Sequence, residues 1–136
     1  MNYVWSADLE TGNSTIDGQH RELIDALNGL MEAIEKGKGS DALSDSLNFL
    51  NDYTIKHFFD EEALQKKYRY PDFESHKKLH DGFKTVIHDL KVREIWNGKS
   101  DELADEVHKK IGNWLVTHIK GEDVKVAAHI RSQKPS

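Results

Sequence analysis

The stretch HFFDEEALQKKYRYPDFESHKKLH, residues 57–80, decides the fold because it places two helical segments on either side of one short break. His57 and Glu61 are four residues apart before the break, and His76 and His80 are four apart after it. Side chains at this spacing share one face of a helix, one turn above the other. A short break between two long helices forces them to lie antiparallel, so both pairs fall at the same end of a bundle.

Apolar residues at helical spacing continue outward from this stretch and predict four helices. The expected helices run from about Ile16 to Gly37, from Ser40 as N-cap to about Lys67, from about Pro71 to Asn97, and from Ser100 as N-cap to about His118. Residues 1–14 are expected to form an irregular arm, and residues 124–136 a short tail. The prediction is a single all-α domain over residues 1–136, with an up-down-up-down antiparallel four-helix bundle at 15–123.

The composition argues against several functional classes. Nineteen Lys and Arg against 24 Asp and Glu give a net charge of −5 without a basic stretch, which disfavours nucleic acid and anionic membranes as partners. The sequence has neither an apolar run near 18 residues nor the pattern of a signal peptide. The absence of Cys excludes disulfides and thiolate metal sites and fits a cytoplasmic location. A start at Met without a signalling domain favours a free-standing protein.

Seven side chains with metal-ligand chemistry fall at one end of the predicted bundle. They are His20, His57, Glu61, His76, His80, His118 and Asp123. Asp123 is five residues beyond His118, and Gly121 between them could end the helix and let Asp123 fold back. Five imidazoles and two carboxylates exceed the needs of one four-coordinate zinc ion and suit two octahedral irons. Because a buried unpaired carboxylate is costly, a pair of cations would also resolve the charge of the inward-facing acids.

The ligand types leave iron, manganese and zinc open as the metal. The sequence lacks the E-x-x-H pattern of ferritin-like di-iron proteins, so the carboxylate-rich oxidases and oxygenases are disfavoured. A histidine-rich site should favour low oxidation states and reversible chemistry. The remaining histidines, His88, His108 and His129, are expected to be solvated surface residues.

The motifs of this chain resemble the hemerythrins, and more closely the single-domain bacteriohemerythrins. The resemblance begins with W-x-x-x-L-x-T-G at residues 5–12 and I-D-x-Q-H at residues 16–20. It continues with H-x-x-x-E at 57–61, H-x-x-x-H at 76–80 and H-x-x-x-x-D at 118–123. It therefore covers most of the chain, and no ligand position of the family is missing.

The resemblance implies a non-haem di-iron centre as the cofactor. One iron is expected to take His76, His80 and His118, and the other His20 and His57, with Glu61, Asp123 and an oxo or hydroxo group as bridges. Such bridging leaves one coordination position open for a small molecule. The residues that the resemblance places around the O2 pocket are Leu23, Phe58, Trp114, Leu115 and Ile119, all apolar and within a turn of the ligands.

The expected function is reversible O2 binding for storage, delivery or sensing, without enzyme activity. O2 is the only partner that the resemblance implies, and the sequence identifies no protein partner. Two alternatives use the same centre. One is an enzyme that removes peroxide or nitric oxide, and the other is a regulatory module that responds to O2 or iron.

Overall fold

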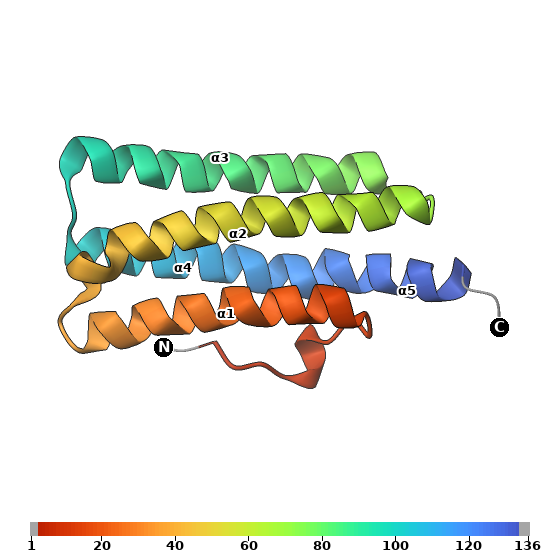
Figure 1. Cartoon of the computed structure of the whole chain (residues 1–136), viewed down its shortest axis with the longest axis horizontal. Helices are drawn as coiled ribbons and strands as arrows, with labels where there is room; N and C mark the ends of the chain where they lie inside the picture. Colours follow the sequence, from red (N-terminus) through yellow and green to blue (C-terminus); the bar gives the residue numbers. More distant parts are fainter. Residues whose placement is uncertain (1–2, 134–136) are drawn as a thin grey trace.

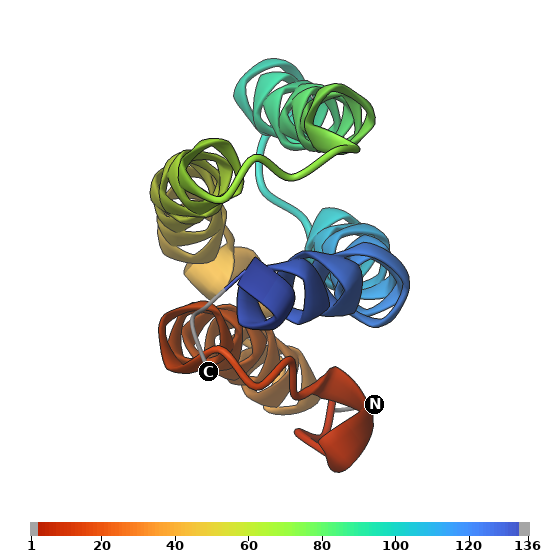
Figure 2. The same ribbon diagram turned by 90° about the vertical axis from the view of Figure 1, so that its right-hand side faces the viewer.

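The computed structural model describes residues 3–133, which form a bundle of four long helices with no β-strand in that range. The bundle consists of α1 (Ser14–Glu35), α2 (Gly39–Lys67), α3 (Phe73–Asn97) and α4 (Asp101–His118). Successive helices run in opposite directions (Figure 1), and the end-on view shows them around a common centre (Figure 2). The predicted all-α, up-down-up-down architecture is confirmed.

Capping interactions at the helix starts decide two of the predicted boundaries. Ser100 caps α4 as predicted, since its side chain accepts a hydrogen bond from the backbone N–H of Leu103 at 3.0 Å. The prediction that Ser40 caps the second helix is wrong, because α2 already begins at Gly39. The Ser40 N–H instead donates to Asp101 Oδ1 at 3.0 Å, which joins the starts of α2 and α4.

The C-terminal segment differs from its prediction as a short tail. One π-helical turn, η2 (Ile119–Asp123), follows α4 and leads directly into a further helix, α5 (Val124–Gln133). Figure 1 shows α5 extending the line of α4 beyond the α2–α3 turn. Val126 and Ile130 are buried against Tyr70, so α5 has an apolar face of its own. The rest of the predicted tail, residues 134–136, lies outside the described residues, as do residues 1–2 of the predicted arm.

The N-terminal arm is irregular apart from one 3-10 turn, η1 (Ala7–Leu9), and it lies along α1. Its backbone is anchored at Tyr3, whose N–H donates to Asn28 Oδ1 at 2.8 Å. The side-chain amide of Asn28 in turn donates to the carbonyl of Tyr3 at 2.7 Å. The arm is therefore held by α1 through a reciprocal pair of hydrogen bonds.

The core divides into two halves of different chemistry. Near the α1–α2 and α3–α4 turns the buried residues of all four helices are almost entirely apolar: Leu27, Leu30, Leu43, Leu47, Leu50, Ile87, Leu90, Leu103 and Val107. Near the α2–α3 turn, buried polar residues replace many of them.

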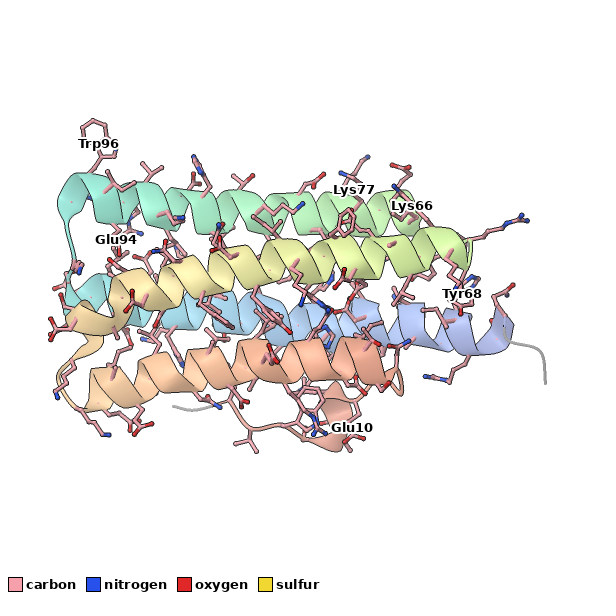
Figure 3. All side chains as sticks on the ribbon, viewed as in Figure 1. Glu10, Lys66, Tyr68, Lys77, Glu94 and Trp96 are labelled. Atoms are coloured by element: carbon pink, nitrogen blue, oxygen red, sulfur yellow. The ribbon has the colours of Figure 1, made fainter. Side chains whose placement is uncertain are left out.

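Outside the core, Trp96 projects away from the far end of α3 (Figure 3). No helix within residues 3–133 is both long and apolar enough to cross a bilayer.

Candidate metal centre

The seven side chains predicted as ligands lie together in the half of the bundle near the α2–α3 turn, and each is at most 4 % exposed. They form two overlapping groups, in each of which the ligand atoms lie within 4.8 Å of one another. One group is His76, His80, His118, Glu61 and Asp123, and the other is His20, His57, Glu61 and Asp123. Glu61 and Asp123 belong to both groups, so the arrangement provides two adjoining positions with two shared carboxylates.

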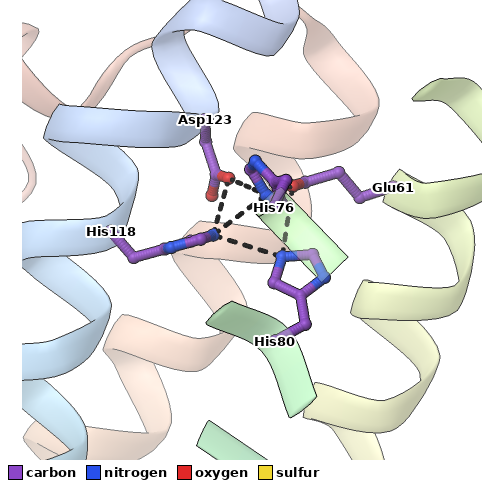
Figure 4. A group of neighbouring side chains, drawn as sticks. All are labelled: Glu61, His76, His80, His118 and Asp123. Carbon is purple, nitrogen blue, oxygen red and sulfur yellow. Dashed lines mark hydrogen bonds and ion pairs between the residues drawn. The ribbon is translucent and has the colours of Figure 1, made fainter. Parts of the chain in front are cut away.

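The larger group directs three imidazole nitrogens at one point (Figure 4). His118 Nε2 lies 3.1 Å from His76 Nε2 and 3.2 Å from His80 Nε2. Glu61 Oε1 lies 2.7 Å from His76 Nε2 and 3.5 Å from His80 Nε2. Since α3 provides two of these imidazoles and α4 the third, the group holds the two helices together.

The smaller group connects α1 and α2 to the same carboxylates. His20 Nε2 lies 2.9 Å from Asp123 Oδ2, and His57 Nε2 lies 3.4 Å from Glu61 Oε2. The two imidazole rings meet edge-on, with centroids 4.7 Å apart. All five histidines of the two groups therefore present Nε2 to the centre, and Nδ1 faces away from it.

Asp123 reaches the centre by a route that differs from the prediction. Gly121 was expected to end the helix, but the chain continues through the π-helical turn of η2 instead. Hydrogen bonds in a π-helix join residues five apart, so Asp123 comes onto the same side as His118. Its Oδ1 lies 3.1 Å from His118 Nε2. The spacing of five residues in H-x-x-x-x-D thus corresponds to one π turn.

Several inward-facing polar atoms are better placed to bind a cation than to form hydrogen bonds with one another. His20 Nε2, Glu61 Oε2 and both carboxylate oxygens of Asp123 are buried without a hydrogen bond of acceptable geometry, although close N···O pairs surround them. Within residues 3–133, neither carboxylate forms an ion pair with Lys or Arg. Buried polar groups without partners are costly. Metal ions at the two positions would satisfy these atoms and balance the carboxylate charge.

The electrostatics of the cluster favour ionised carboxylates. Burial would raise the pKa of Asp123, but the surrounding His118, His20 and His76 outweigh it and hold that pKa well below its usual value. Burial would also raise the pKa of Glu61, whose histidine neighbours lower it instead. The carboxylates of Glu61 and Asp123 therefore stay negatively charged, and bound cations would neutralise that charge.

The histidines respond to their surroundings in opposite directions. Burial lowers the pKa of His57 to about 4, so its ring is neutral and its nitrogen is free to bind a metal. Burial would lower the pKa of His76 as well, but the nearby carboxylates of Asp123 and Glu61 outweigh it and raise the pKa to about 9. A proton on His76 thus compensates the carboxylates in the absence of metal.

Two of the imidazoles are held from behind by side chains that the sequence analysis did not identify. His57 Nδ1 donates to Gln19 Oε1 at 2.6 Å, and the Gln19 amide donates to Asp60 Oδ2 at 2.8 Å. His80 Nδ1 donates to Glu62 Oε2 at 2.9 Å. Gln19 and Glu62 each stand next to a predicted ligand in the sequence, but periodicity points a neighbouring residue away from the ligand face. Only the packing of α1 and α3 against α2 brings them behind a ligand of another helix.

The five residues expected to line an O2 pocket are placed in or against the apolar core. Leu23, Phe58, Leu115 and Ile119 are buried, and Trp114 is partly buried beside them. The Phe58 ring stacks on His80 with centroids 3.7 Å apart, and the Trp114 ring stacks on His118 at 4.3 Å. A hollow of about 530 Å³ beside Trp114 also reaches His118. Their role toward O2 stays a prediction.

The three histidines outside the cluster have different surroundings. His88 is exposed on α3, as predicted. The prediction of a solvated His108 is wrong, because it is buried with its ring centroid 5.0 Å from that of Tyr3 in the N-terminal arm. His129 is only half exposed, because α5 brings its Nε2 to within 2.7 Å of the Tyr68 carbonyl. Both differences come from terminal segments that cover the bundle.

Comparison with known proteins finds a matching family and similar proteins over nearly the whole length of this chain. The hemerythrin HHE cation binding domain matches residues 11–130. Bacteriohemerythrin of Pseudomonas aeruginosa strain LESB58 is 32% identical over 128 residues, which are 94% of this chain and 81% of that protein. Hemerythrin of Themiste dyscrita is 33% identical over 128 residues, 94% of each chain.

Solved structures agree with these relatives. The crystal structure of a wild-type hemerythrin superposes with a TM-score of 0.83 at 27% identity, covering 94% of this chain and 97% of the other. The matched region contains both carboxylates and all five imidazoles of the cluster. The chain therefore belongs to the hemerythrin HHE cation-binding domain family.

Proposed function

We propose that this protein binds O2 reversibly at a non-haem di-iron centre, for storage, delivery or sensing of oxygen. The observation that carries the proposal is the convergence of five Nε2 atoms on two shared, ionised carboxylates that have no Lys or Arg partner among residues 3–133. Membership of the hemerythrin family supports this choice over other metal-binding functions.

The residues divide unequally between the two proposed irons. His76, His80 and His118 would hold one iron, and His20 and His57 the other. Glu61 and Asp123, which belong to both groups, would bridge them together with an oxo or hydroxo group. The position with two imidazoles thus has one protein ligand fewer, and there a small molecule would find room. A pair of irons would supply the electrons that reversible O2 binding requires.

The surrounding side chains support binding rather than turnover. Leu23, Phe58, Trp114, Leu115 and Ile119, proposed to line the O2 pocket, carry no ionisable group that could deliver or remove a proton. Their apolar surfaces would also exclude water, which slows the displacement of bound oxygen. The enzyme alternative would require an acid or base beside the centre, so we propose an oxygen-binding protein without enzyme activity.

The test is iron content together with the visible absorption of anaerobically reduced protein, before O2 is added, after addition and after its removal. About two irons per chain and a colour that appears with O2 and fades on its removal are expected. Two irons with only irreversible oxidation would instead support an enzyme or redox sensor. A chain that binds no iron would contradict the proposed centre altogether.

Variants at two histidines separate the centre from general effects of histidine loss. His57→Ala should abolish the reversible colour change, because it removes one of only two imidazoles at the position proposed for O2. His88→Ala is the matched control, since His88 is exposed on α3 and should leave the spectrum unchanged. His108→Ala is a poor control, because that ring is buried against the N-terminal arm. Equal loss in His57→Ala and His88→Ala would contradict the division of the histidines.

A further inference from the structure

The outer nitrogens of two histidines are held by a second layer of side chains, one in each proposed metal position. We propose that Glu62 and the Gln19–Asp60 pair are positioning residues that fix His80 and His57 for metal binding. We further propose that the carboxylate of Glu62 makes the three-imidazole position the tighter of the two. The inference rests on the dinuclear site of the proposed function and assigns an order of metal loading to it.

The orientation of His57 follows from a chain of hydrogen bonds that begins at Asp60. A carboxylate can only accept, so the Gln19 amide must present its NH₂ group to Asp60 Oδ2, 2.8 Å away. Its carbonyl oxygen then faces His57 Nδ1 at 2.6 Å and accepts a hydrogen bond from it. With the proton on Nδ1, the lone pair of His57 lies on Nε2 and faces the centre. Asp60 therefore sets the tautomer of a ligand that it does not touch.

His80 is fixed by a charged partner. Glu62 Oε2 accepts from His80 Nδ1 at 2.9 Å, and the Glu62 side chain is 14 % exposed. A carboxylate behind a metal-bound imidazole holds the ring and increases its basicity, and the loss of such a partner typically weakens metal binding 10–100-fold. The neutral amide of Gln19 gives His57 the same orientation with less gain in basicity.

The other imidazoles show that this support is selective. The Nδ1 atoms of His20 and His76 are buried without a hydrogen-bond partner. In each proposed position, therefore, one imidazole has a side chain that fixes its tautomer, and at least one other imidazole has no such partner. The position with three imidazoles combines an additional ligand with the charged partner, and both differences favour metal binding there.

The experiment is a stepwise Co(II) titration of metal-free protein, followed by the visible absorption of the ion and by calorimetry. Wild-type protein should bind two ions with unequal Kd values. Glu62→Leu should weaken the tighter step about 10–100-fold, and Gln19→Leu should weaken the other step by a smaller factor, because a neutral acceptor is lost. Glu62→Gln keeps an acceptor for His80 without the charge and should recover part of the loss. Asp52→Asn is the control, because it removes one negative charge from the exposed surface of α2.

The pattern of the two binding steps distinguishes positioning from a general structural effect. Wild-type protein that binds fewer than two ions would overturn the dinuclear site and this inference with it. Two ions in wild type, with Kd values that Glu62→Leu and Gln19→Leu leave unchanged or change in the same step, would overturn this inference alone. Thermal melting of the metal-free variants shows whether they fold like wild type, so that a shift in Kd is not a result of unfolding.

Discussion

Leu47 and Glu61 lie on the same helix, α2, and each is 0 % exposed, yet they belong to halves of the bundle with opposite chemistry. They are separated by roughly 20 Å at 1.5 Å per residue. Around Leu47 the helices meet through leucine, isoleucine and valine, whose burial stabilises the fold without any ligand. Around Glu61 they meet through imidazoles and carboxylates, whose burial is costly until their charges and lone pairs are satisfied.

The comparison shows how one fold can carry a reactive site. The apolar half provides stability that is independent of the centre, and it positions all four helices for the polar half. The polar half is then an unfavourable region of the core that metal ions would make favourable. If this division is correct, the two halves should respond differently to metal, mutation and pH.

Metal removal should produce the largest effect. Ions that bind only the folded protein stabilise it by about 4 kcal/mol at a thousandfold excess over Kd. For a domain of this size we therefore expect a chelator to lower Tm by roughly 10 °C or more. Differential scanning calorimetry of loaded and metal-free protein measures this shift. Equal melting temperatures would mean that the polar half does not depend on metal.

Truncation in the apolar half should destabilise both forms equally. Leu47→Ala removes a fully buried side chain, and we expect a loss of about 2–5 kcal/mol in the free energy of unfolding. Because Leu47 lies far from the centre, the loss should add to the effect of metal removal, and metal stoichiometry should stay the same. Denaturant titrations with and without metal check both points. A changed stoichiometry would show that the halves are coupled.

Acid should destabilise the polar half of the metal-free protein through His57. Its folded-state pKa of about 4 lies below the ordinary value of 6.5. Between pH 6.5 and pH 4, therefore, His57 binds a proton in the unfolded chain but not in the folded protein. Its contribution to stability is complete above pH 6.5 and is lost as the pH falls toward 4. Tm measured from pH 6.5 to 4.5 should therefore fall less in His57→Leu than in wild type. Leu47→Ala should keep the wild-type dependence, and parallel curves for all three proteins would remove His57 from the explanation.

A rise in pH should destabilise the metal-free protein through His76, whose pKa is shifted in the opposite direction to that of His57. Its folded-state pKa of about 9 lies above 6.5, so the folded protein retains a proton that the unfolded chain has released. This contribution is complete below pH 6.5 and is lost as the pH rises toward 9. Metal-free wild type should thus lose Tm between pH 7 and 9, whereas His76→Leu should lose less. A steeper loss in the variant would contradict this assignment.

The smallest effect is expected at the cap of α4, in the apolar half. Ser100→Ala removes the hydrogen bond to the Leu103 N–H and should cost about 1 kcal/mol. The cost should be the same with and without metal, and it is measurable by urea denaturation. Ser40→Ala is the matched control, because Ser40 lies inside α2 and its side chain caps nothing. A larger cost at Ser40 would reverse our correction of that boundary.

Local patterns in the sequence predicted the four helices and the gathering of the seven candidate ligands at one end, because helical period and chain reversal depend on neighbouring residues. These patterns failed where segments far away in the sequence determine a helix boundary or the burial of a side chain. Gly39 reads as a helix breaker, but it lies at the start of α2, where a Cβ would be 2.8 Å from Ile34 and 3.3 Å from Ala104, so this glycine serves the close packing of three helices. His108 reads as a surface residue because the arm that covers it is some hundred positions away in the sequence.

The layer behind the ligands could not be predicted for a related reason. Gln19 supports a histidine of α2 from α1, and Glu62 supports a histidine of α3 from α2. Each contact depends on the rotation of two helices about their axes, which apolar periodicity gives only approximately. The start of α5 was not predicted because Gly121 reads as the end of the fourth helix, whereas the chain continues through η2 into α5.

The π-helical turn has a consequence for how this chain can change over evolution. Loss of a single residue from η2, such as Gly121, would place His118 and the aspartate four residues apart, a spacing that an ordinary α-helix also brings onto one face. The deletion would therefore exchange the π turn for an α turn, with both ligands still on one side of the helix and Ile130 still on the side of Tyr70. A hemerythrin-like chain with H-x-x-x-D in place of H-x-x-x-x-D is therefore expected to lack the π turn and still hold both ligands at the centre.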